Sequence, residues 1–242
     1  MQTSVAIVVS GSFQYRTSTG GELMTPGSWL LGNAGDGFTC GHEHGTGDRC
    51  ISFWYDEEFR ERIASGAGAT RLRFQAPRLA PMRPLSGIVA QTAELLTAAD
   101  PAAFEELAIR ALAHAIQLQD GYVQPPGDAE PSSLARVTRV VRMIENDRDV
   151  PHDLPSLARI AQLSPYHFLR TFEGVTGTTP HQYLLRTRLR RVAVRLRAES
   201  AKILDIALDC GFGDVSNFNR VFRAEFGVSP RAYRNRRAFH KI

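Results

Sequence analysis

A fifty-residue repeat in the second half of the chain constrains its fold more than any other feature. Each copy contains two phenylalanines four residues apart with an arginine midway, then a glycine, a proline and a tyrosine. The pairs are Phe168 and Phe218, Arg170 and Arg220, Phe172 and Phe222, Gly177 and Gly227, Pro180 and Pro230, and Tyr183 and Tyr233. Upstream, Leu157-Ala158 and Ile206-Ala207 match, with one extra residue in the second copy. A fixed period predicts one structural unit used twice.

The repeated unit is expected to be helical. Phenylalanines four residues apart lie on one face of a helix, and the arginine between them points away from the core that they share. A glycine suits the left-handed end of that helix, and a proline suits the first turn of the next one. The repeat therefore predicts two helix-turn-helix units. The recognition helix of such a unit places its exposed N-terminal residues in the major groove of DNA.

The helix between the two units gives a geometric check on this interpretation. Residues Pro180–Ala198 have one apolar side and arginines on the other faces. A helix of this length spans about 28 Å at ~1.5 Å per residue. That length allows two recognition helices to lie about one turn of DNA (~34 Å) apart. Around it, further helices are expected at 134–147, 154–161 with Asp153 as N-cap, 165–174, 203–210, 215–226 and 230–237.

Charge is distributed unevenly along the chain. Residues 1–130 carry 9 Lys and Arg against 15 Asp and Glu, whereas residues 131–242 carry 20 against 10. The net charge of +4 therefore combines an acidic half with a basic half. A basic half favours a polyanionic partner, and nucleic acid is the first such class. Most of its basic residues are arginines, which suit bidentate recognition of phosphate and guanine. Genomic base composition also favours arginine over lysine, but it does not explain the asymmetry.

The second half resembles the DNA-binding domain of a known family. Residues 134–237 are similar to that domain in the AraC/XylS family of bacterial transcription regulators. The resemblance rests on Leu157-Ala158, Leu163-Ser164-Pro165-Tyr166-His167-Phe168, Arg170-x-Phe172, Gly177-x2-Pro180, Arg188-Leu189, Ile206-Ala207, Gly211-Phe212, Phe218-x-Arg220-x-Phe222 and Gly227-x-Ser229-Pro230-x2-Tyr233-Arg234. It implies seven helices and binding in consecutive major grooves. It also implies an N-terminal cupin-like β-barrel for effector sensing and dimerisation.

The residues expected to touch DNA lie on the exposed faces of the two recognition helices and on nearby arginines. DNA contacts are predicted for Pro165, Tyr166, Leu169 and Arg170 in the first unit and for Val215, Ser216, Asn219 and Arg220 in the second. Asn219 suits adenine, and Arg220 suits guanine or phosphate. Phosphate contacts are predicted for Arg186, Arg190, Arg231 and Arg234. The alternative for each arginine is a solvated surface charge. Asp214 is expected to be an N-cap, and His167 to pack or bond to the backbone.

The first half is expected to contain strands followed by two helices. Closely spaced glycines separate short apolar segments at 4–10, 28–31 and 50–55, a pattern typical of an antiparallel barrel or sandwich. The helices are predicted at 85–98 and Pro101–Gln119, with Asp100 as N-cap of the second. The fold class is therefore α+β with two domains. A cupin-like domain is expected at 1–121, a Pro- and Gly-rich linker at 122–133 and the all-α domain at 134–242.

A cluster of cysteines and histidines is the most unusual string of the first half. On a strand, Cys40, His42 and His44 share one face, and Cys50 returns beside them after a turn. These side chains suit zinc or another divalent metal, and the string resembles half of a cupin His-x-His motif. The usual acid is missing after it, and no second cupin motif is evident. The alternatives are a thiol redox sensor and a Gly-rich turn without a ligand.

We therefore predict a sequence-specific transcription regulator, either an activator or a repressor. It is not expected to be an enzyme; a cupin metalloenzyme fused to a DNA-binding module and a non-specific architectural DNA binder are the other classes. Three cysteines, no basic residues before the first apolar stretch and no apolar run near ~20 residues predict a cytoplasmic protein. The predicted partners are double-stranded DNA, a second copy of the chain and a small-molecule or metal effector, with RNA polymerase as a further candidate and no membrane. DNA binding itself is expected to need no cofactor.

Overall fold

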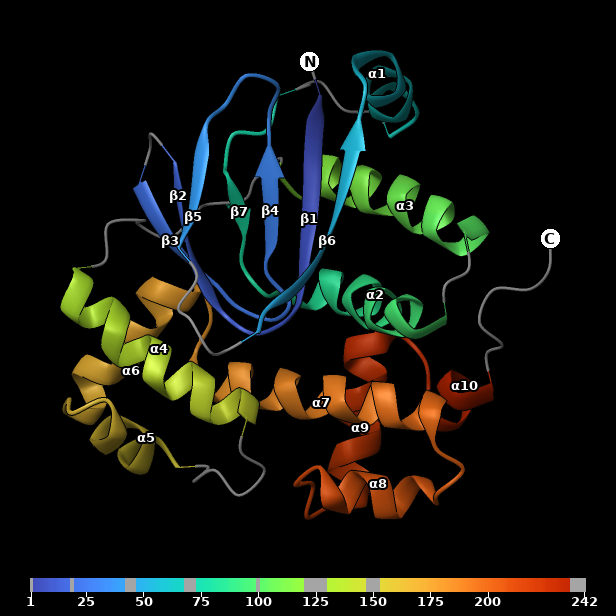
Figure 1. Cartoon of the computed structure of the whole chain (residues 1–242). Helices are drawn as coiled ribbons and strands as arrows, with labels where there is room; N and C mark the ends of the chain where they lie inside the picture. Colours follow the sequence, from blue (N-terminus) through green and yellow to red (C-terminus); the bar gives the residue numbers. More distant parts are fainter. Residues whose placement is uncertain are drawn as a thin grey trace.

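The computed structural model describes residues 2–17, 20–41, 47–67, 73–98, 101–119, 130–146 and 153–235. Strands and three helices make up the N-terminal half, and helices alone make up the C-terminal half (Figure 1). The coarse expectation of an α+β chain with a β-rich first half and a helical second half is therefore confirmed.

Two antiparallel sheets form the centre of the N-terminal half. Their strands are β1 (Thr3–Ser10), β2 (Phe13–Thr17), β3 (Gly20–Met24), β4 (Trp29–Gly32), β5 (Phe38–Gly41), β6 (Arg49–Tyr55) and β7 (Arg78–Leu79). One sheet has the order β6-β1-β4-β7 and the other the order β3-β2-β5. Side chains of β1 alternate between two cores, as expected for a strand covered on both faces. Ile7 faces the helices, whereas Val8 packs with Phe13 and Tyr15 of the second sheet.

The predicted closed cupin-like barrel is not confirmed. Among the described strands no ladder of hydrogen bonds joins the two sheets. A barrel closes only when its last strand pairs with its first. Here β7 has two residues and β5 has four. Such short edge strands offer little backbone for closure, so this part of the chain is an open two-sheet structure.

Three helices accompany the sheets, one more than predicted. They are α1 (Glu57–Gly66), α2 (Ser86–Ala98) and α3 (Pro101–Gln119), with a short 3-10 turn at Arg83–Leu85 before α2. The missed helix is α1, which is rich in charged residues and whose short apolar face, Phe59 and Ile63, packs against the core. Asp56 caps it by accepting a hydrogen bond from the Phe59 backbone N–H at 2.7 Å. The predicted cap of α3, Asp100, lies outside the described residues.

Seven helices form the described part of the C-terminal half, as the resemblance implied. They are α4 (Pro131–Asn146), α5 (Leu154–Ile160), α6 (Pro165–Thr176), α7 (Pro180–Ala198), α8 (Ile203–Asp209), α9 (Val215–Phe226) and α10 (Pro230–Asn235). The bounds of α7 and α9 are those predicted from the sequence. Asp153 caps α5 by accepting from the Ser156 N–H at 2.8 Å, also as predicted. The helix α4 starts at Pro131, so 131–133 are helical and not linker; 122–129 lie outside the described residues.

The sequence repeat is also a repeat in three dimensions. The rings of Phe168 and Phe172 lie 5.4 Å apart, and those of Phe218 and Phe222 lie 5.6 Å apart. In each unit the second phenylalanine meets the repeat tyrosine edge-to-face, at 5.7 Å for Tyr183 and 5.5 Å for Tyr233. The recognition helices end at Gly177 and Gly227, whose φ angles are 74° and 75°. The prediction of two equivalent helix-turn-helix units is confirmed.

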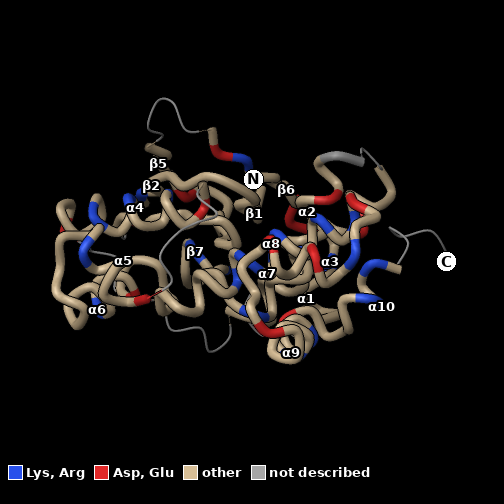
Figure 2. The backbone as a smooth tube through the Cα atoms, turned by 90° about the horizontal axis from the view of Figure 1, so that it is seen from below, with Lys and Arg blue, Asp and Glu red and all other residues tan. Residues whose placement is uncertain are grey.

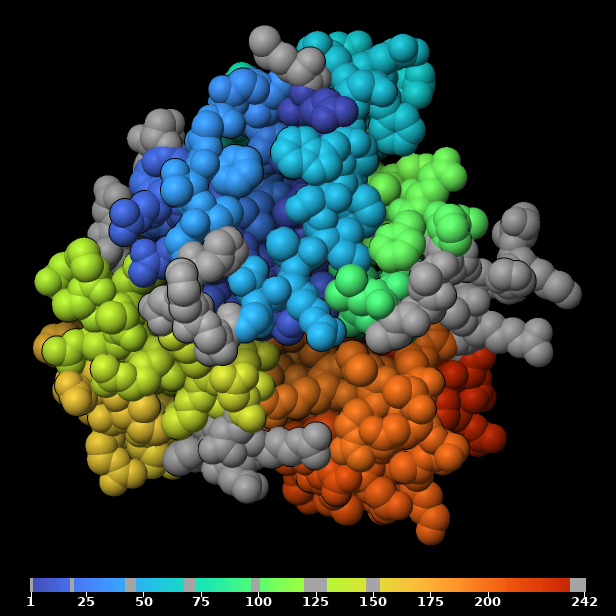
Figure 3. Space-filling view, viewed as in Figure 1, coloured from blue at the N-terminus to red at the C-terminus, as the bar shows by residue number. Residues whose placement is uncertain are grey.

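The two halves of the chain are in contact, as Figure 3 shows. Leu23 of β3 belongs to the apolar core of the first unit, and Ala90 of α2 belongs to the core of the second. The N-terminal half therefore touches both helix-turn-helix units. Within the described part of the chain, no helix has the length and apolar character needed to cross a bilayer.

Candidate nucleic-acid interface

The exposed face of α6 presents the first set of predicted contacts. Ser164 caps the helix, and its hydroxyl accepts from the His167 backbone N–H. Pro165 and Arg170 are exposed, Leu169 is half-buried, and the Tyr166 side chain is 63% exposed. The Arg170 guanidinium lies 6.0 Å from the centre of the Tyr166 ring and donates to its hydroxyl at 3.4 Å. This contact holds an aromatic ring and a cation side by side at the start of the helix.

The exposed face of α9 presents the second set. Asp214 is the N-cap, as predicted, and its carboxylate accepts from the Ser216 N–H at 2.8 Å. All four predicted DNA contacts of this helix, Val215, Ser216, Asn219 and Arg220, are exposed. Arg220 donates to the Asn217 side-chain oxygen at 2.7 Å. Asn217, which the sequence did not single out, thus orients the arginine of this helix.

The two faces share an electrostatic character. Backbone N–H groups at a helix N-terminus attract phosphate, because they are only partly used within the helix. Both recognition helices begin among exposed residues and both carry the repeat arginine one turn further on. Figure 2 shows α6 and α9 along the same edge of the molecule, viewed from below. The arrangement provides two similar anion-attracting surfaces on one molecule.

Arg186 and Arg190 do not lie with these surfaces. Arg186 donates to the Pro81 carbonyl at 2.7 Å and pairs with Glu225 at 3.4 Å. Arg190 pairs with Glu145 at 2.9 Å. Both side chains are largely buried between the two halves, and burial lowers the pKa of the Arg186 guanidinium. Their predicted phosphate contacts are therefore corrected: in this arrangement Arg186 joins the halves through Pro81, whereas Arg190 is held by Glu145 within the C-terminal half.

The other two predicted phosphate contacts lie on α10. Arg231 is exposed, in keeping with a phosphate contact. Arg234 is half-buried, and its Nε and Nη2 atoms have no hydrogen-bond partner among the described residues. His167, for which a backbone or packing role was expected, has its ring Nδ1 3.2 Å from the Ser164 hydroxyl.

Sequence reasoning missed the charged residues that join the halves. Arg78 of β7 is 1% exposed and pairs with Glu22 at 2.8 Å. It also donates to the carbonyls of Val175 and Thr176, at 3.2 and 2.6 Å, which belong to the last turn of α6. A lone arginine in a two-residue strand has no sequence pattern that distinguishes it from a surface charge. The contact is visible only in three dimensions.

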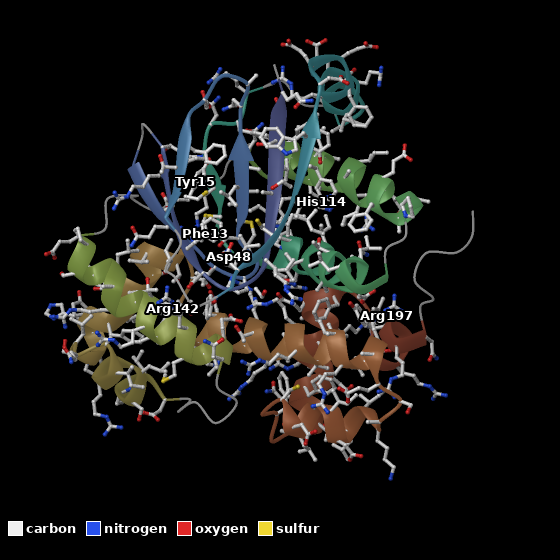
Figure 4. The ribbon with its side chains drawn as sticks, viewed as in Figure 1. Phe13, Tyr15, Asp48, His114, Arg142 and Arg197 are labelled. Atoms are coloured by element: carbon white, nitrogen blue, oxygen red, sulfur yellow. The ribbon has the colours of Figure 1, made fainter. Side chains whose placement is uncertain are left out.

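A second contact between the halves surrounds α2. Ser86 at the start of α2 donates to Glu225 of α9. Glu94 of α2 accepts from Arg197 of α7, which Figure 4 labels, and from the Tyr233 hydroxyl, each at 3.1 Å. The same view shows Phe13 of β2 and Arg142 of α4, which line a small cavity where the sheets meet α4.

The predicted metal cluster is only partly described. His42 and His44 lie outside the described residues, whereas Cys40 is half-buried on β5 and Cys50 is exposed on β6. Burial, together with the charge of Cys50, raises the pKa of the Cys40 thiol. The described residues alone hold no group of three or more His, Cys, Asp or Glu side chains suited to a metal ion. The effect of Cys50 on the Cys40 thiol places the two cysteines near each other, on strands of different sheets.

The fold and the two exposed recognition helices define a DNA-binding protein with paired helix-turn-helix units. A family model described as "Helix-turn-helix domain" matches residues 157–236. The chain is 34% identical over 100 residues to the regulatory protein SoxS of Salmonella typhimurium, covering 41% of this chain and 94% of SoxS. It is also 34% identical over 120 residues to the transcriptional activator RhaR of Cronobacter sakazakii, covering 50% of this chain but 42% of RhaR. The chain belongs to the AraC family of DNA-binding transcription regulators.

The solved structures that match this chain are less similar to it than the sequence relatives are. An AraC-type regulator from Chromobacterium violaceum is 30% identical, with a TM-score of 0.40, and the match covers 43% of this chain and 94% of that one. ToxT of Vibrio cholerae is 13% identical, with a TM-score of 0.40, and the match covers 96% of this chain and 88% of that one. The named sequence relatives are transcription regulators and not enzymes, in agreement with the sequence-based prediction.

Proposed function

We propose that this chain binds specific DNA sites through α6 and α9 together and activates transcription there. The matched geometry of the two units carries the proposal. Each presents an exposed N-terminal face with the repeat arginine at the same place, Arg170 and Arg220, and α7 separates them. At ~1.5 Å per residue α7 is about 28 Å long, which suits two adjacent major grooves. RNA polymerase is the partner that activation would require.

Individual contacts follow from the chemistry of the exposed side chains. Arg170 and Arg220 suit guanine or phosphate, and Asn219 suits adenine. Tyr166, beside Arg170, suits a sugar or a thymine methyl. The first turns of the two helices would fix how each helix sits in its groove. The side chains in or next to these turns are Pro165 and Leu169 on α6 and Val215 and Ser216 on α9. Arg231 and Arg234 would add phosphate contacts from α10.

The N-terminal half would control this activity through its contacts with both units. Arg78 binds the end of α6, while Ser86 and Arg186 hold Glu225 of α9. A signal that shifts the N-terminal half would therefore bias the relative placement of the two recognition helices. Such coupling requires an effector or a partner copy with different affinities for the two arrangements.

The test is an equilibrium titration of an enriched genomic DNA site at fixed salt. Arg170→Ala and Arg220→Ala should each weaken specific binding by about 1–3 kcal/mol. Arg62→Ala is the matched control, because Arg62 is an exposed arginine on α1, away from both recognition helices. Unchanged affinity in both recognition-helix variants would show that α6 and α9 do not recognise the DNA sequence. Equal affinity for random DNA at the same salt would instead indicate an architectural binder.

We also propose a zinc site at Cys40, His42, His44 and Cys50, since the two cysteines approach each other from β5 and β6. Metal analysis of untagged protein should then find about one zinc per chain, which Cys40→Ser/Cys50→Ser removes. Absence of zinc from wild-type protein supplied with the metal would contradict the zinc site. A Cys40–Cys50 disulfide in non-reducing peptide mass spectrometry would point to redox sensing.

We also propose that two copies of the chain form a homodimer. The helix α2 already packs on α7 of the same chain, so a dimer would use the outer side of α3, where Ile109 is exposed. Sedimentation at micromolar concentration should give a dimer that Ile109→Glu dissociates. A wild-type monomer under those conditions would contradict it.

A further inference from the structure

A cavity of about 430 Å³ opens where the two halves meet, and we call it the seam cavity. Its walls come from β1, α2, α4, α7 and the end of α8. Ligand-binding pockets in proteins commonly have volumes of ~300–1,000 Å³. The seam cavity is therefore large enough for a small organic molecule, and its walls belong to both halves of the chain.

One wall of the seam cavity is apolar. Val89, Ala90 and Ala93 of α2 line it together with Val9 of β1. Leu184 and Val194 of α7 add apolar surface from the C-terminal half. An apolar part of a ligand would lose water on entering between these side chains, which favours binding.

The opposite wall is rich in arginine. Four arginines of α7, Arg188, Arg190, Arg191 and Arg195, line the seam cavity, against two carboxylates, Glu145 and Asp209. Arg190 already pairs with Glu145 at 2.9 Å, and Arg195 pairs with Asp209 at 3.0 Å. The two carboxylates are thus engaged by two of the four arginines.

The other two arginines have no carboxylate partner that the structure records. Within the part of the chain that the structure describes, Arg191 donates only to backbone carbonyls, those of Ile144 and Glu145, at 2.7 and 2.8 Å. The Nη2 atom of Arg188 is buried and has no hydrogen-bond partner among the described residues. A buried, unpaired donor costs free energy that an acceptor from a ligand would recover. Burial and the nearby charge of Arg191 both lower the pKa of Arg188, so the two cations lie close together.

We propose that the seam cavity binds a small organic anion, whose acidic group pairs with Arg188 and Arg191 and whose apolar part packs against α2 and Val9. Arginine suits planar, bidentate pairing with carboxylate, sulfonate or phosphate groups. The excess positive charge of one wall and the apolar surface of the other select an amphiphilic anion over a neutral or cationic molecule.

The position of the anion links both helix-turn-helix units. A Cβ atom added at Gly211 would lie 3.1 Å from Arg188 Nε, so this guanidinium rests on the turn before α9. Arg191 binds the end of α4, which packs on α6. A ligand held by both arginines would therefore stabilise the arrangement in which the N-terminal half, α4 and the α8–α9 turn are packed together. This regulatory step rests on the proposed DNA-binding function, whereas the binding step does not.

The test of binding uses two fluorescent probes of the same shape. 8-Anilinonaphthalene-1-sulfonate carries an acidic group, and N-phenyl-1-naphthylamine is its neutral counterpart. The 242-residue protein should bind the sulfonate saturably at one site per chain and the neutral probe at least tenfold more weakly. Arg188→Gln should weaken sulfonate binding at least tenfold, and Arg62→Gln should leave it unchanged.

A cavity-filling variant keeps the proposal testable if Arg188→Gln fails to fold. Ala93→Phe would place a ring in the seam cavity while retaining every arginine, and it should also abolish sulfonate binding. Equal binding of the two probes, non-saturable binding, or full sulfonate affinity in both cavity variants would overturn the proposal. A saturating sulfonate concentration should also change affinity for the enriched DNA site several-fold in wild type and not in Ala93→Phe. Loss of that effect alone would overturn the regulatory step and leave the binding site standing.

Discussion

Arg78 is the residue through which the N-terminal sheets hold the first recognition helix. It is buried, pairs with Glu22, and donates to two carbonyls in the last turn of α6. Those carbonyls have no partner within the helix, because the last turn of a helix leaves its C=O groups free. One cation therefore satisfies the end of α6 and links it to β3 and β7.

Replacement of Arg78 should be strongly destabilising. Arg78→Leu leaves the Glu22 carboxylate and two carbonyls buried without this donor, so urea unfolding should show a loss of about 3–5 kcal/mol. The double variant Glu22→Leu/Arg78→Leu should be more stable than Arg78→Leu alone, because it also removes the buried Glu22 carboxylate that has lost its arginine. A single variant as stable as wild type would show that the buried pair contributes nothing to the contact between the halves.

Elements of the C-terminal half follow from local signals in the sequence. The caps Thr179 and Asp214 start α7 and α9, and the left-handed Gly227 ends α9. These signals act over a few residues, which explains why the bounds of α7 and α9 could be predicted. The sheets depend instead on pairing between distant segments, so whether the barrel closes could not be predicted. The helix α1 is short and highly charged, and its small apolar face gives only a weak helical pattern in the sequence. The roles of Arg186 and Arg190 were missed for a related reason: their partners Pro81, Glu225 and Glu145 lie far away along the chain.

Two glycine substitutions should have opposite effects on the helix-turn-helix elements. Gly227→Ala should lower stability by about 1 kcal/mol, because Gly227 has φ +75° although its surroundings are open. Gly174→Ala, inside α6 and also in open surroundings, should raise stability by about 0.5–1 kcal/mol. Thermal unfolding of both variants checks the pair. The same sign of change in both would contradict the assigned helix ends.

The cap of α5 should be sensitive to acid. Hydrogen bonds from Ser156 lower the pKa of the Asp153 carboxyl below its ordinary value of 3.8. The folded pKa lies below the unfolded one, so this contribution is present above the unfolded pKa and is lost as pH falls through the folded pKa. Asp153→Asn should keep the cap but remove this part of the acid dependence, as followed by helical circular dichroism between pH 5 and about 2. An unchanged acid profile in this variant would contradict the role of Asp153.

At the scale of the whole molecule, an acidic half and a basic half are packed into one structure. The charge asymmetry and the repeat were enough to predict a DNA-binding regulator with two DNA-recognition units, because both features are visible in the linear sequence and do not depend on how the halves pack. The seam cavity and the contacts from Arg78, Ser86 and Glu94 could not be predicted, because they arise only where the halves meet. These contacts reach both recognition units, so the placement of one half constrains how the other meets DNA.

Footprinting of an enriched genomic site by the 242-residue protein tests the central claim most directly. The account predicts two protected blocks about one helical turn (10–10.5 bp) apart on one face of the DNA. It also predicts that Arg220→Ala loses one block, and that a 5-bp insertion between the blocks sharply weakens binding. A single block that Arg170→Ala and Arg220→Ala both leave intact, or affinity indifferent to the insertion, would contradict two recognition helices acting together.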